Sequence, residues 1–145
     1  MIIINIKQLL LGFSLLLSTL SYASANDKVS ITDGFIKPTI PGSTVTAAYM
    51  TINNLTDNTI TLQKVTGDIS SNIEIHEHTM SDGMMRMREV EHIQISAHNK
   101  AVLQPSGLHL MFFAVKQQIT EQDTIPLTLY FSDQSTVNIQ LPVRR

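Results

Sequence analysis

The feature that most limits the fold of this chain is an alternation of β-branched and polar residues from Val29 onward, interrupted by turn-forming residues roughly every eight to twelve positions. An alternation of period two is typical of strands that bury one face. Short strands at this spacing predict an all-β domain, a sandwich or a barrel. The expected strands are residues 30–37, 45–53, 59–65, 73–79, 84–89, 101–104, 108–115, 126–131 and 136–142.

The gaps between these stretches are rich in Gly, Pro, Asn, Asp and Ser, whose backbone preferences favour turns. Residues 117–123 are the one candidate for a helical turn, because no long segment keeps an apolar repeat of 3.6 residues. A chain of 145 residues is long enough for one domain with its own core and too short for two.

The first 25 residues have the pattern of a secretory signal peptide. Lys7 is their only charged side chain, residues 9–20 are mostly apolar, and small residues end the segment at Ala25. The weaker alternative is a retained membrane anchor, but polar residues near Lys7 leave an apolar run too short to span a bilayer. We therefore expect cleavage after Ala25, an exported mature domain of residues 26–145, and no membrane insertion after cleavage.

Composition excludes several classes of function. The net charge is −2 and the chain has no run of basic residues, so the sequence does not predict a basic surface that would bind the phosphates of a nucleic acid. The chain has no cysteine, which excludes disulfides, a thiol nucleophile, Cys-ligated zinc, blue copper and a lipid anchor on an N-terminal cysteine. Motifs for a serine nucleophile or a phosphate-binding loop are absent too, so we do not expect an enzyme.

Histidine and methionine instead gather in one window of the sequence. Imidazole and thioether together form a soft donor set that suits monovalent copper, whereas zinc prefers thiolate and carboxylate, and calcium or magnesium takes oxygen. Thioether also needs no deprotonation to bind a metal. The clustered residues are His76, His78, Met80, Met84, Met85, Met87, His92, His98, His109 and Met111.

Strand geometry predicts which of these side chains share a face, because residues two apart on a strand point the same way. His76, His78 and Met80 form one such set, Met85 with Met87 a second, and His109 with Met111 a third. The Asp82-Gly83 dipeptide is a hairpin signal, and a two-residue loop places His78 opposite Met87 and Met80 opposite Met85. A four-residue loop would place His76 opposite Met87 instead, whereas an odd-length loop would separate the two sets.

The spacing also resembles the signature of the periplasmic PCuAC-type copper chaperones. In that signature a His is followed by ten residues and a Met, then by twenty-one residues and a His-x-Met, and His76, Met87, His109 and Met111 match every interval. Segments around Glu74-Ile75-His76-Glu77, residues 82–88 and residues 103–111 are similar to the family as well, as are residues 47–50 and 123–143.

The resemblance implies a cupredoxin-like Greek-key β-sandwich or barrel. It implies that His76, Met87, His109 and Met111 hold one Cu(I) ion, with Cu(II) as the alternative oxidation state. It further implies delivery towards the binuclear copper centre of cytochrome c oxidase, with the copper-bearing oxidase subunit or a Sco-type thioredoxin-like protein as partner. His78 occupies a place where relatives often have Met, and a His- and Met-rich tail found in some relatives is missing after Val143.

Alternatives remain open from the sequence. The same copper site would also suit a copper-buffering protein without an oxidase acceptor, and a secreted adhesion domain would make the His and Met residues incidental. His78 and Met80 are open as auxiliary ligands. We expect Met50 in the core and Arg88 paired across the strands with Glu77. His92 and His98 fall outside the spacing and are expected at the surface.

Overall fold

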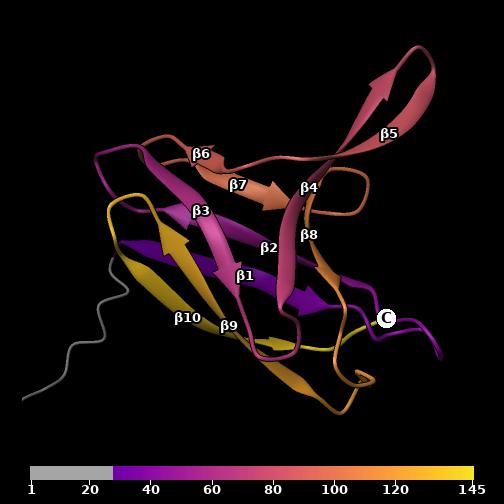
Figure 1. Cartoon of the computed structure of the whole chain (residues 1–145). Helices are drawn as coiled ribbons and strands as arrows, with labels where there is room; N and C mark the ends of the chain where they lie inside the picture. The colour runs from indigo at the N-terminus through magenta and orange to yellow at the C-terminus, as the bar shows by residue number, and fades with distance from the viewer. Residues whose placement is uncertain (1–27) are drawn as a thin grey trace, which may run out of the picture.

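The computed structural model describes residues 28–145, which form ten strands and no helix (Figure 1). The predicted leader, residues 1–25, lies outside the described residues. Within the described part there is no helix that could cross a bilayer. The strands are β1 (Val29–Ile36), β2 (Thr46–Asn54), β3 (Ile60–Thr66), β4 (Asn72–Ser81), β5 (Met84–Glu89), β6 (Ile93–Ile95), β7 (Lys100–Leu103), β8 (Leu108–Phe113), β9 (Thr124–Phe131) and β10 (Thr136–Pro142).

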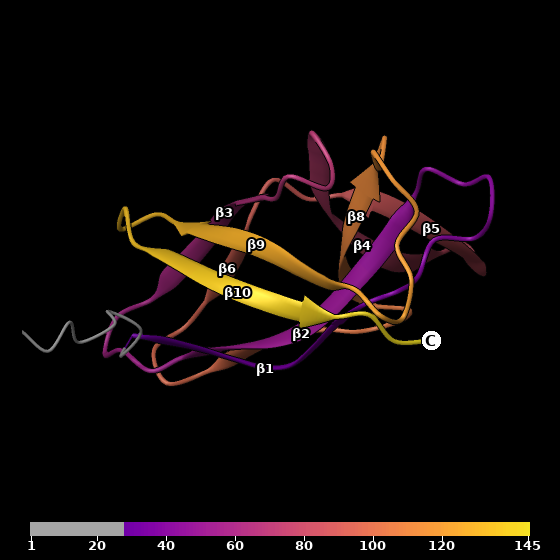
Figure 2. The same cartoon turned by 90° about the horizontal axis from the view of Figure 1, so that it is seen from below.

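The strands form two sheets. One has six strands in the order β1-β2-β7-β8-β4-β5, and the other has four in the order β10-β9-β3-β6. Figure 2 shows β1 running close to β10, and a parallel bridge between Ile36 and Val143 links the two sheets at this side. The predicted all-β, cupredoxin-like architecture is confirmed.

The core lies between the sheets and follows directly from the alternation in the sequence. On β2, every second residue from Thr46 to Asn54 is buried, and Met50 is among them, as predicted. On β8, Leu110 and Phe112 are fully buried and belong to the core. His109 and Met111 alternate with them and therefore belong to the outer face of the six-stranded sheet.

The structure differs from the sequence predictions at two places. The strand β6 was not predicted, because three residues give too short an alternation to distinguish a strand from a loop. Its Ile93 and Ile95 are nevertheless buried. Residues 117–123 do not form a helical turn; there Asp123 accepts hydrogen bonds from the backbone N–H and the hydroxyl of Thr120, which satisfies these donors without a helix.

The β4–β5 hairpin has the predicted two-residue loop, with Ser81 and Met84 as the closing pair. Asp82 and Gly83 have φ angles of 53° and 75°, the positive values that a tight hairpin turn of this type requires. In Figure 1 this hairpin projects beyond the body of the sandwich. Every residue of β5 is exposed, so the hairpin presents its side chains to solvent and adds little to the core.

Candidate metal centre

Three adjacent strands of the six-stranded sheet, β5, β4 and β8, carry the predicted ligands. His76 on β4 lies directly opposite His109 on β8, and their ring centroids are 5.9 Å apart. Both side chains point away from the core, because Ile75 and Leu110 beside them are buried in it. Two residues that are 33 positions apart in the sequence therefore form the centre of the site.

The ring of His76 is oriented by Glu74, which lies two positions earlier on the same face of β4. Nε2 of His76 is 2.7 Å from Oε2 of Glu74. A carboxylate only accepts, so Nε2 carries the hydrogen and Nδ1 carries the lone pair. Nδ1 of His76 is buried and has no hydrogen-bond partner. A buried nitrogen in this state is suited to a metal ion, and the carboxylate–imidazole pair is the arrangement that commonly orients a metal-binding histidine.

His109 is fixed by a different acceptor. Its Nδ1 donates a hydrogen bond of 3.0 Å to the backbone carbonyl of Gly107, which leaves the lone pair on Nε2. His109 is only 2% exposed although it is on the outer face, because neighbouring rings cover it. Tyr49 lies 6.4 Å away between ring centroids and His78 lies 4.9 Å away in a stacked arrangement.

Electrostatics favour an ionised carboxylate at Glu74 and a neutral imidazole at His109. Hydrogen bonds from His76, and next from Asn72, hold the pKa of Glu74 below its ordinary value. Burial lowers the pKa of His109, although the hydrogen bond to Gly107 partly opposes this shift. Burial also raises the pKa of Tyr49, which stays a neutral phenol at physiological pH. The neutral form of imidazole is the form that binds metals.

The two predicted thioether ligands flank the histidine pair. Met111 follows His109 by two residues on β8, and its cross-strand neighbours are Glu74 on β4 and Ala47 on β2. Ala47 offers only a methyl group there, which leaves room for the longer side chain of Met111. Met87 lies on β5 directly opposite His78, diagonal to His76, and is 46% exposed.

The hairpin register settles which expected loop is present. Because Ser81 pairs with Met84, His78 faces Met87 and Met80 faces Met85, as the two-residue loop predicts. The alternative four-residue loop, with His76 opposite Met87, is wrong. Arg88 lies opposite Glu77 in this register as predicted.

His78 is the additional donor that the structure brings to the site. Its Nδ1, like that of His76, is buried and without a hydrogen-bond partner. Residues 28–145 contain no three His, Cys, Asp or Glu side chains that converge to hold a metal. Two carboxylates also lie beside His76: Glu74 bonds its Nε2, and Glu89 is its cross-strand neighbour on β5. The four predicted ligands themselves, two imidazoles with two thioethers, form a neutral, soft set suited to a monovalent ion.

Sequence reasoning did not assign Glu74, Gly107 or Tyr49 a role at the site. Glu74 could have been found, since it shares a face with His76 on a predicted strand. Gly107 acts through its carbonyl oxygen and Tyr49 belongs to β2, so neither carries a local sequence signal. His92 and His98 are exposed, as predicted, and His98 bonds Asp57 at 2.7 Å.

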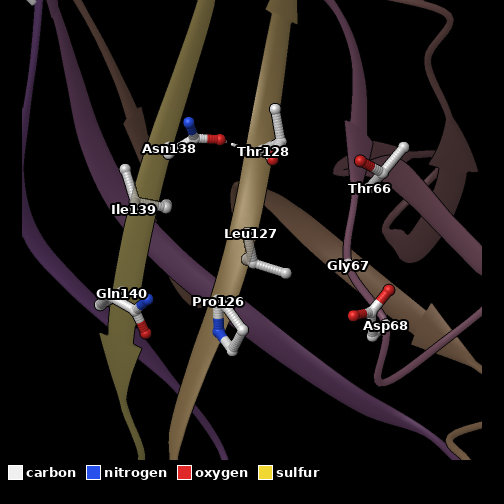
Figure 3. A pocket seen from close by; sticks show the side chains of 9 residues that line it. All are labelled: Thr66, Gly67, Asp68, Pro126, Leu127, Thr128, Asn138, Ile139 and Gln140. Carbon is white, nitrogen blue, oxygen red and sulfur yellow. Dashed lines mark hydrogen bonds between the residues drawn. The ribbon is translucent and has the colours of Figure 1, made fainter.

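A separate groove lies on the four-stranded sheet, beside β9 and β10 and the end of β3 (Figure 3). Its volume is about 410 Å³ and its floor is crossed by a hydrogen bond of 2.8 Å from Thr128 to Asn138. Of the residues that the structure describes, Asp68 is the only charged one that lines it, and no histidine or methionine does. This groove is therefore not part of the candidate metal centre.

Comparison with known sequences gives one family match that covers most of the chain. The family model described as "Putative lipoprotein LpqE-like" matches residues 29–143. "Putative lipoprotein Lxx21020" of Leifsonia xyli subsp. xyli is 29% identical over 119 residues, which are 81% of this chain and 70% of the relative. "Uncharacterized protein RP573" of Rickettsia prowazekii is 26% identical over 98 residues, 66% of this chain and 54% of the relative.

Solved structures with the same fold are similar over most of their length. The copper-bound PCuAC domain from PmoF2 has a TM-score of 0.69 at 18% identity, and the match covers 81% of this chain and 92% of that domain. The solution structure of CuI-DR1885 from Deinococcus radiodurans has a TM-score of 0.67 at 27% identity, and the match covers 86% of this chain and 83% of that protein. The first of these likenesses bears on the fold alone.

Proposed function

The chain belongs to the LpqE-like family and has the fold of PCuAC domains, and we propose that it is a carrier of a single Cu(I) ion. In this proposal Nδ1 of His76, Nε2 of His109 and the sulfurs of Met87 and Met111 hold the ion. The solved structures named for bound copper, the PmoF2 domain and CuI-DR1885, support copper as the metal. The protein is then a binding protein and not an enzyme.

The observation that carries the proposal is the state of the two central imidazoles. Each has one nitrogen committed to a fixed acceptor, Glu74 for His76 and Gly107 for His109. The remaining nitrogen of His76 is buried without a partner, which is unfavourable unless a further group binds it. A metal ion between the facing rings would satisfy it, and the neighbouring thioethers select a soft one.

A neutral donor set also suits a protein that must release its cargo. Four uncharged ligands shield the cuprous ion from free solution but bind it less tightly than thiolates do. An acceptor with cysteine ligands can therefore remove the ion by ligand exchange, in which copper stays Cu(I) and only its bonds change. We propose the copper-bearing subunit of cytochrome c oxidase, or a Sco-type thioredoxin-like protein that serves it, as this acceptor.

An extracytoplasmic location is consistent with this role. The leader pattern of residues 1–25 is typical of a cleaved signal peptide, and the Leifsonia relative is named a lipoprotein. We propose that the mature domain, residues 26–145, works in the periplasm. Mass spectrometry of the exported protein tests this, with a mature N-terminus at Asn26 as the expected result.

The ligand assignment is tested by titrating the mature domain anaerobically with Cu(I) in competition with a chelator. Met87→Ala and His109→Ala should each weaken binding at least as much as the roughly 10- to 100-fold loss typical when a ligand loses its hydrogen-bond partner. Met84→Ala and His92→Ala are the controls, because both residues are exposed, Met84 lies on the other face of the hairpin, and His92 falls outside the ligand spacing. Equal affinities in all four variants would contradict the assignment.

Delivery and buffering use the same site and differ only in the acceptor. Deleting the gene and measuring oxidase activity at limiting copper, against survival at excess copper, separates them. Loss of oxidase activity that added copper restores is expected for delivery. Normal oxidase activity with lower survival in excess copper would instead assign the protein to copper tolerance.

A further inference from the structure

The tip of the β4–β5 hairpin carries thioethers that the four-ligand site does not use. Met80, Met84 and Met85 are 68%, 56% and 59% exposed. Exposed side chains of this size are unfavourable in water, and three of them on one short hairpin need an explanation. Core packing does not provide it, because none of the three is buried.

The register divides these methionines between the two faces of the hairpin. Met80 and Met85 lie directly opposite each other, on the face that also carries His78 and Met87. Met84 pairs with Ser81 and therefore belongs to the other face. Residues directly opposite on antiparallel strands have Cβ atoms about 4.5–5.5 Å apart. The flexible side chains of Met80 and Met85 can therefore both reach a single ion.

This pair continues the row of donors that leads to the proposed copper site. The next cross-strand pair along the same face is His78 with Met87, and the one after it begins with His76. Successive pairs on one face are about 6.5–7 Å apart along the strands. His78 lies between the tip and the centre, and its buried Nδ1 has no hydrogen-bond partner.

We propose that Met80 and Met85 form a second, weaker site for a soft monovalent ion, through which Cu(I) reaches and leaves the central site. The ion exchanges one thioether or imidazole for the next and remains cuprous throughout. The tip projects beyond the sandwich, where an acceptor can reach it (Figure 1). The transfer role rests on the proposed function, whereas ion binding by the pair does not.

Nuclear magnetic resonance of ¹³C-methyl methionine in the whole mature domain tests the pair directly, with Ag(I) as a redox-inert probe and Cu(I) as the second. The first equivalent should shift Met87 and Met111. Further ion should shift Met80 and Met85 together, at one apparent affinity, while Met84 stays in place. Met84 is the matched control because it is exposed on the same hairpin but on the other face.

Two results would overturn the second site: Met80 and Met85 that do not respond, or Met84 that responds at the same ion concentration as they do. A response of Met80 and Met85 without one at Met87 and Met111 would contradict the central site while supporting the second. Failure of the proposed function and failure of this inference therefore give different spectra.

The transfer role is tested by stopped-flow removal of Cu(I) from the loaded domain by a soluble thiol acceptor. Replacing both tip residues, Met80→Leu with Met85→Leu, should leave the equilibrium affinity of the central site unchanged. It should slow removal about tenfold, which corresponds to ~1.4 kcal/mol in the barrier. Met84→Leu should not slow it. An unchanged rate in the double variant would overturn the transfer role.

Discussion

His76 and His109 face each other across neighbouring strands, yet opposite ring nitrogens are held: Nε2 of His76 by Glu74, and Nδ1 of His109 by the carbonyl of Gly107. Each acceptor fixes one tautomer, because neither a carboxylate nor a carbonyl can donate. The two lone pairs available for a metal are then Nδ1 of His76 and Nε2 of His109. The pair is therefore chemically asymmetric, although its positions in the two strands are equivalent.

The first prediction concerns Glu74. Glu74→Ala should weaken Cu(I) binding roughly 10- to 100-fold, because the His76 ring loses the group that orients it. Glu74→Gln should lose less Cu(I) affinity, since its amide oxygen still accepts the hydrogen bond from Nε2 of His76. Glu77→Ala, on the other face of β4, is the control and should bind normally. Chelator competition measures all three, and normal affinity in Glu74→Ala would show that Glu74 does not position the ligand.

The second prediction concerns pH. Burial holds the pKa of His109 below the ordinary 6.5, so in the metal-free protein its ring signals should titrate below that value. The unfolded chain then binds the proton more readily than the folded one. The associated stability is present above pH 6.5 and is lost as the pH falls through the folded pKa.

Histidine-detected NMR measures this titration, and urea unfolding at several pH values measures the stability. In the His109→Gln variant, the free energy of unfolding should fall less steeply as the pH is lowered below 6.5. A His109 ring that titrates at or above 6.5 would contradict the burial argument.

The third prediction concerns hairpin parity. A glycine inserted between Asp82 and Gly83 should shift the register of β5 against β4 by one residue, which moves Met87 to the other face of the hairpin. Cu(I) affinity should fall to the level of a Met87→Leu variant. A two-residue insertion preserves parity and should retain more affinity. If the two insertions weaken binding equally, the face on which Met87 lies does not matter.

The fourth prediction concerns Asn54, which is 1% exposed. Its amide donates to the carbonyls of Asn58, Ile95 and Ser96, and its Oδ1 accepts from Thr56. Asn54→Ala should lower the free energy of unfolding by about 2–3 kcal/mol, because buried carbonyls lose their donor.

Asn53→Ala is its control. Asn53 is less buried, and within residues 28–145 its side chain donates only to Ser30. The loss in the free energy of unfolding should therefore be about 1 kcal/mol or below. Chemical denaturation compares the two variants. Equal losses would show that the hydrogen bonds of Asn54 add little to the stability of the fold.

Much of the fold could be predicted because alternation is a local signal. The period-two pattern of β2 maps directly onto its buried and outward residues, and Asp82-Gly83 predicted the register of the β4–β5 hairpin. The three-residue β6 was missed because its strand character comes from pairing with β3, a contact that is distant in sequence. Residues 117–123 were misjudged because Asp123 satisfies the donors of Thr120, and Thr39 that of the Ile119 backbone, without a helix.

The sequence predicts which residues form the candidate site, but it does not predict how their histidine rings are oriented. The intervals between His76, Met87, His109 and Met111 are visible in the sequence, and strand parity follows from the turn. The ring nitrogen that each histidine presents depends on Gly107, whose carbonyl direction is set by the local backbone. The cover that Tyr49 gives to His109 depends on pairing between β2 and β8, which no local pattern specifies.

The all-exposed strand β5 has a consequence for self-association. Among residues 28–145 it pairs with β4 alone, so within this part of the chain its other row of backbone N–H and C=O groups is open to a strand from a second molecule. Arg86 and Arg88 lie on this edge strand, on the face opposite Met85 and Met87, and two copies of β5 paired along the edge would bring these like charges together. The cations thereby oppose edge-to-edge association of two molecules, which the exposed thioether side chains of β5 would otherwise favour.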